Sequence, residues 1–106
     1  IARAKASRSA MGTGLWEVIE GSARTLVPRA SLVPAIATGV TDARFLREQG
    51  AIAYGFGLYS PRMQAAQIPA MVHGDNERVD VESLALMRGL WSAIFDGLRE
   101  RPPHSR

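Results

Sequence analysis

The chain has 106 residues, no cysteine and a formal net charge of +3 at pH 7, which fits one domain of ordinary size and excludes disulfides and cysteine-based zinc sites. The positive charge lies at the two ends of the chain, with +3 on residues 1–8 and +2 on residues 99–106. The body, residues 9–98, carries a net charge of −2. Because the body is slightly acidic and no apolar run approaches the ~18 residues that cross a bilayer, we expect neither nucleic-acid binding nor membrane insertion.

The first predicted element is a helix over residues 13–27. Its apolar residues recur at spacings of three and four, as on one face of a helix, and Thr13 is suited to cap its N-terminus. Pro28 lacks a backbone donor and ends the pattern.

A strand, a helix and a second strand are predicted next. Residues 31–37 (SLVPAIA) and 51–57 (AIAYGFG) are short apolar runs typical of buried strands. Between them, Thr41 or Asp42 can cap a helix that runs to Gly50, a residue suited to terminate it. This order within about 25 residues is typical of a βαβ unit.

The remaining chain is predicted to be a loop, a long helix and a tail. Residues 57–72 fit no period, and a loop of this length is functional or disordered. A long helix is predicted after Asp80, which is suited to cap it, and Trp91 and Phe95 are expected in the core. One face of this helix is apolar and contains Val81, Leu84, Met87, Leu90, Trp91, Ile94, Phe95 and Leu98. We expect a flexible lead-in over 1–12, an ordered segment over 13–98 and a disordered tail over 99–106.

The fold class predicted from these elements is α/β, with a partial, mostly parallel sheet flanked by helices. Two or three strands make a thin sheet compared with the usual five or six. Since the chain also begins at isoleucine, we expect a segment of a larger catalytic domain.

No complete active site is expected within this sequence. His73 and His104 are the two histidines, and a zinc centre needs three or four ligands. From local pattern alone, His73 is typical of a solvated loop residue. Thr41 and Asp42 are typical of capping residues, and Arg44 of an exposed helix cation.

Three stretches taken in order resemble one enzyme family: Gly-x-Thr-Asp-x-Arg at residues 39–44, Tyr-Gly-Phe at 54–56 and His-Gly-x-x-Glu at 73–77. Their order and spacing resemble the C-terminal portion of the aminoacylase, carboxypeptidase S and succinyl-diaminopimelate desuccinylase family of zinc peptidases and amidohydrolases. The resemblance covers residues 31–98. It implies a zinc-exopeptidase-like catalytic domain with two zinc ions.

The resemblance implies particular roles for a few residues. His73 would bind one zinc ion, and the turn of Gly39, Thr41, Asp42 and Arg44 would bind the carboxylate of the substrate. The substrates implied are N-acyl amino acids or small peptides with a free carboxylate. No catalytic residue is expected in this segment, because the family's general-base glutamate and its other metal ligands lie upstream.

The resemblance also implies partners for the chain. These are the N-terminal part of the same enzyme, which would supply the missing ligands and a lid domain, and further copies in a homo-oligomer. We expect the location to be cytoplasmic. Two other interpretations stay open: a non-enzymatic α/β interaction module, and nucleic-acid binding by the basic ends.

Overall fold

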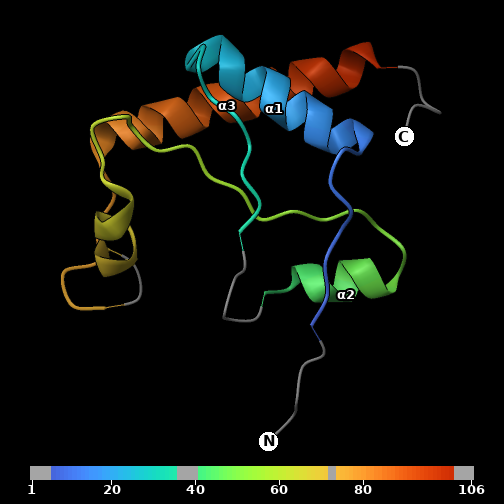
Figure 1. Cartoon of the computed structure of the whole chain (residues 1–106), viewed down its shortest axis with the longest axis horizontal. Coiled ribbons are helices and arrows are strands. Elements are labelled where there is room, and N and C mark those ends of the chain that lie inside the picture. Colours follow the sequence, from blue (N-terminus) through green and yellow to red (C-terminus); the bar gives the residue numbers. More distant parts are fainter. Residues whose placement is uncertain (1–5, 36–40, 72–73, 102–106) are drawn as a thin grey trace, which may run out of the picture.

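Two long antiparallel helices form the main packed unit of the protein (Figure 1). The computed structural model describes residues 6–35, 41–71 and 74–101. In chain order the elements are α1 (Gly14–Leu26), α2 (Ala43–Glu48), the short 3-10 helices η1 (Ala65–Gln67) and η2 (Pro69–Met71), and α3 (Val81–Glu100). No described helix is long and apolar enough to cross a membrane.

The ends of α1, α2 and α3 follow from local chemistry, largely as predicted. The Thr13 hydroxyl accepts a hydrogen bond from the Trp16 amide at 3.2 Å, and the Asp80 carboxylate accepts one from the Ser83 amide at 3.0 Å. Both side chains therefore satisfy amides that a helix N-terminus leaves without partners. Gly50 follows α2 with φ of 85°, a left-handed conformation that glycine adopts without strain.

The core lies where α1 packs against α3. It contains Val18, Ile19 and Ala23 of α1 and Leu90 and Ile94 of α3. Two glycines of α3 allow a close approach: a Cβ added at Gly97 would lie 3.0 Å from Val18, and one at Gly89 would lie 3.1 Å from Leu26. At one end of the pair, Arg101 donates to the Gly14 carbonyl at 3.1 Å.

The predicted α/β fold with a parallel sheet is wrong for the described residues, which contain no strand. Residues 31–35 and 51–57, placed in the two predicted strands, are irregular, and residues 36 and 37 lie outside the described ranges. A strand requires a neighbouring backbone to pair with. Around Ala53, side chains take that place: its amide donates to the Ser9 hydroxyl at 2.9 Å, and its carbonyl accepts from the Arg47 guanidinium.

Residues 51–60 cross the molecule beside the helix pair and connect α2 to η1 (Figure 1). Tyr54 packs edge-on against Trp16, with ring centroids 5.6 Å apart, and Phe56 packs against Trp91 at 5.1 Å. The Ser60 amide donates to the buried Ser83 hydroxyl at 2.8 Å. The segment is thus anchored by side chains of α1 and α3 and not by a sheet.

The prediction that Trp91 and Phe95 of α3 lie in the core is wrong, although two other residues of the same apolar face do lie there. Leu90 and Ile94 are buried, but Trp91 is 46% exposed and Phe95 is 59% exposed. α1 packs on the side of α3 that carries Leu90 and Ile94, so the neighbouring side with Trp91 and Phe95 stays in contact with solvent.

Candidate functional site

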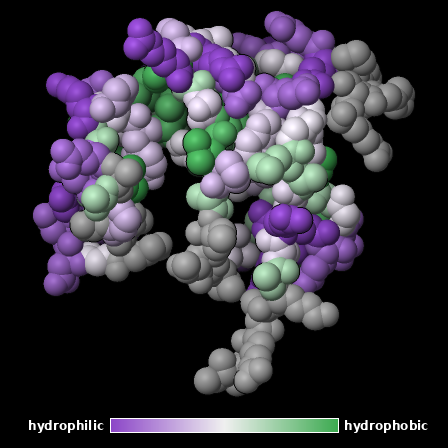
Figure 2. All heavy atoms as spheres, viewed as in Figure 1, coloured by the Kyte–Doolittle hydropathy of each residue, from purple (hydrophilic) through white to green (hydrophobic). Residues whose placement is uncertain are grey.

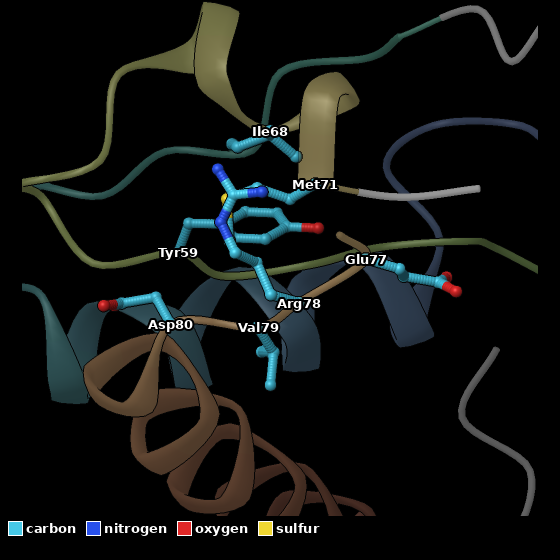
Figure 3. A pocket seen from close by; sticks show the side chains of 7 residues that line it. All are labelled: Tyr59, Ile68, Met71, Glu77, Arg78, Val79 and Asp80. Atoms are coloured by element: carbon cyan, nitrogen blue, oxygen red, sulfur yellow. The ribbon is translucent and has the colours of Figure 1, made fainter. Parts of the chain in front are cut away.

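A pocket of about 420 Å³ lies between the loop after residue 58, the two 3-10 helices and the chain that enters α3 (Figure 3). Seven residues line it: Tyr59, Ile68, Met71, Glu77, Arg78, Val79 and Asp80. Small-molecule sites commonly have volumes of roughly 300–1,000 Å³. The pocket therefore has the size of a site for a small ligand.

The backbone around the pocket is fixed by a closed turn. The Arg78 amide donates to the Met71 carbonyl at 3.0 Å, and the Met71 amide donates to the Ile68 carbonyl at 3.0 Å. Asn76 has φ of 58°, a left-handed conformation that asparagine adopts more readily than most residues. The Arg78–Met71 bond holds the chain that enters α3 beside η2.

The charged side chains that line the pocket point in different directions. Figure 3 shows the Arg78 guanidinium in the middle of the lining side chains, whereas the carboxylates of Glu77 and Asp80 extend to either side. The Asp80 carboxylate accepts hydrogen bonds from the Ser83 amide and hydroxyl, which directs it to the start of α3. The pocket therefore combines apolar walls with one arginine and two carboxylates.

His73, the predicted zinc ligand, lies outside the described residues, and so does Gly39. The described neighbours of His73 are Met71, which is buried, and Gly74, which is exposed. Among the described residues, no three histidine, cysteine, aspartate or glutamate side chains are grouped to hold a metal ion.

Thr41, Asp42 and Arg44 lie at the start of α2. Thr41 and Asp42 are exposed, and Asp42 makes no side-chain capping bond, although it occupies the predicted capping position. The guanidinium of Arg44 lies over the ring of Phe45, 4.5 Å from its centroid. None of these three residues lines the pocket, and Figure 1 shows α2 apart from η1 and η2.

The sequence singled out Glu77 and Asp80 of the lining residues, but for other roles, and it did not predict the pocket. Tyr59, Ile68 and Met71 belong to the stretch that fits no period, so no pattern placed them together. Arg78 had a usable signal, because it directly follows the Glu77 of the His-Gly-x-x-Glu motif.

Known proteins add no family assignment. Comparison of the chain with protein-family models, with curated proteins and with solved structures gave no match.

Proposed function

We propose that this chain is the C-terminal segment of a di-zinc metallohydrolase that cleaves the amide bond of N-acyl amino acids or small peptides. The observation that carries the proposal is the ordered set of motifs at residues 39–44, 54–56 and 73–77. A pocket of small-molecule size beside the last motif also supports the proposal.

In this proposal His73 binds one zinc ion through its imidazole, a common zinc ligand. When bound, the metal would supply Lewis-acid activation of the amide carbonyl. Gly39, Thr41, Asp42 and Arg44 would bind the carboxylate of the substrate. The exposure of Thr41 and Asp42 leaves that turn accessible to a ligand.

The proposed partner is the N-terminal part of the same enzyme, which would supply the other zinc ligands and the general base. The exposed side of α3 supports a partner, since Leu84, Trp91 and Phe95 are 46–59% exposed on one helix. Contiguous apolar surface of this kind is typical of a surface that another chain or domain covers. Homo-oligomer formation and a cytoplasmic location belong to the same proposal.

The test is hydrolysis of a panel of N-acyl amino acids by the chain combined with its N-terminal part and loaded with zinc. We expect turnover by the assembled protein. The variant His73→Ala should lose at least about a hundredfold in kcat/KM and one zinc equivalent, because a ligand to the metal is removed.

The matched control is His104→Ala, which removes the other histidine of the chain and should change neither zinc content nor turnover. Unchanged zinc binding and turnover in His73→Ala would contradict the ligand assignment. Absence of both zinc and turnover in the assembled wild-type protein would contradict the enzyme proposal.

A second candidate function is a non-enzymatic interaction module. The exposed residues of α3 favour it, because they are suited to a partner helix or domain whether or not zinc is present. This candidate predicts that Trp91→Glu abolishes partner binding and that His73→Ala has no effect. Zinc-dependent turnover would exclude it.

A further inference from the structure

We infer that the exposed side of α3 is the surface through which two copies of this chain associate, with the two α3 helices antiparallel and Trp91 of each copy at the centre. The proposed function names two kinds of partner, the N-terminal part and further copies, and this inference assigns the exposed side of α3 to a second copy. It goes beyond that function, because association of two copies requires neither zinc nor substrate.

The apolar residues on this side of α3 are arranged symmetrically about Trp91. Five residues follow one another at spacings of 3, 4, 4 and 3: Leu84, Met87, Trp91, Phe95 and Leu98. Because successive residues of a helix are rotated by about 100°, all five lie within about 80° of one another on one face. The same surface on two copies can therefore pair with itself about a twofold axis beside Trp91, as in symmetric dimers.

The symmetry of the spacing indicates the direction of the pair. With the helices antiparallel, Leu84 of one copy lies level with Leu98 of the other. Met87 lies level with Phe95 in the same way. With the helices parallel, each residue would lie level with itself, and the symmetric spacing would have no effect on packing.

The side chains of this surface are available to a partner. Leu84, Trp91, Phe95 and Leu98 are between 42% and 59% exposed, whereas Met87 is half-buried because it packs against the core. Contact with a second copy would remove these apolar groups from water, which favours association in proportion to the area buried.

The two halves of this surface differ in shape, and the difference suits an antiparallel pair. A groove of about 520 Å³ lies along the N-terminal half of α3 and is lined by Val81, Leu84, Ala85, Met87, Arg88 and Trp91. The C-terminal half carries Phe95 and Leu98, whose side chains are exposed. In the antiparallel arrangement these two side chains of each copy lie against the groove of the other.

The length and polarity of α3 also suit such a pair. A helix of 20 residues is about 30 Å long, and two of them that pair along one face form a small interface, below roughly 1,200 Å². We therefore expect a reversible dimer with a dissociation constant of about 1–100 µM. Antiparallel pairing also places the N-terminus of each α3 beside the C-terminus of the other, where the opposite partial charges attract.

The first test is sedimentation equilibrium of this chain from about 1 to 500 µM. We expect a monomer–dimer equilibrium. Trp91→Glu should raise the dissociation constant at least about a hundredfold, because it removes the central aromatic side chain and places two carboxylates against each other. Phe95→Glu, a second variant on the same surface, should also weaken the dimer.

The matched control is Phe45→Glu, which changes an equally exposed aromatic residue on α2. This variant should form dimers as the unmodified chain does. Far-UV circular dichroism of all three variants checks that the helices are retained.

The second test reports the direction of the helices, and it is simple because the chain has no cysteine. Leu84→Cys and Leu98→Cys, mixed and oxidised, should give a cross-linked dimer that contains one copy of each variant. Leu84→Cys alone should not cross-link, because its two cysteines would lie about 21 Å apart along the antiparallel helices and a disulfide requires Cα atoms within about 7 Å. Non-reducing gels and mass spectrometry measure both products.

Several outcomes would overturn the inference. A chain that stays monomeric at about 500 µM, or a dimer that neither α3 glutamate variant weakens, would remove this surface as the site of association. Cross-linking of Leu84→Cys to itself would contradict the antiparallel arrangement. Conversion of the dimer into one-to-one complexes by the N-terminal part would assign the surface to that part.

Failure of the proposed function has a different signature. Dimers as expected, with no turnover by the zinc-loaded assembled protein, would leave this inference standing and contradict the hydrolase. Turnover together with a monomeric chain would do the reverse.

Discussion

The helix pair α1–α3 and the chain between residues 28 and 79 are stabilised in different ways. The pair shares a core in which Ile19, Leu90 and Ile94 are each at most 2% exposed. The intervening chain has short elements, and none of the residues of α2 is buried. Its backbone is held by hydrogen bonds with side chains: the Arg47 guanidinium donates to the Ala53 carbonyl, and the Ser83 hydroxyl accepts from the Ser60 amide.

The difference shows that helices alone do not make a packed structure. Isolated helices shorter than roughly 12–15 residues are marginal in water, and most helical stability comes from burying one face. The 13 residues of α1 and the 20 of α3 bury such a face against each other. The six residues of α2 do not. Figure 2 shows the result as a hollowed molecule in which the segments below the helix pair stand apart.

The largest effect on stability is expected from truncation of the shared core. Leu90→Ala removes most of a side chain that is 1% exposed, so the free energy of unfolding should fall by about 2–5 kcal/mol. Urea or thermal unfolding measures this change. The control is Leu84→Ala on the same helix, which is 56% exposed and should cost less than about 1 kcal/mol. Equal losses for the two variants would contradict the assignment of the core to one side of α3.

The rates of amide hydrogen exchange should differ between the helix pair and the intervening chain. Amides around Leu90 and Ile94 lie in the buried part of α3, whereas those of residues 54–57 make no hydrogen bond among the described residues. We expect the α3 amides to exchange at least about a hundredfold more slowly, because they require opening of the packed helix pair. Comparable protection of residues 54–57 would show that they pair with another backbone segment.

A smaller effect is expected from the helix caps. Asp80→Ala removes the acceptor of the Ser83 amide and should cost about 1 kcal/mol of unfolding free energy. Asp42→Ala is the matched control, since Asp42 precedes α2 but makes no side-chain capping bond. It should change stability by only a few tenths of a kcal/mol, as for other surface substitutions. A cost for Asp42→Ala equal to that for Asp80→Ala would show that the α2 cap forms in solution.

Part of the candidate site could be predicted and part could not. His73 and the turn at Gly39, Thr41, Asp42 and Arg44 come from motifs that can be read in the sequence. The pocket could not be predicted, because Tyr59, Ile68 and Arg78 are separated in the chain and meet only through the closed turn at Met71.

The sequence by itself determined the helices and most of their ends. Periodic apolar residues, the Thr13 and Asp80 caps and Gly50 act within a few residues of one another, so local pattern was sufficient for α1, α2 and α3. Tertiary structure decided whether the apolar runs at 31–37 and 51–57 became strands, and the described parts of both did not. A strand depends on hydrogen bonds to a distant segment, which no local pattern can specify. The same reason applies to α3, where packing of α1 on one side buried Leu90 and left Trp91 46% exposed.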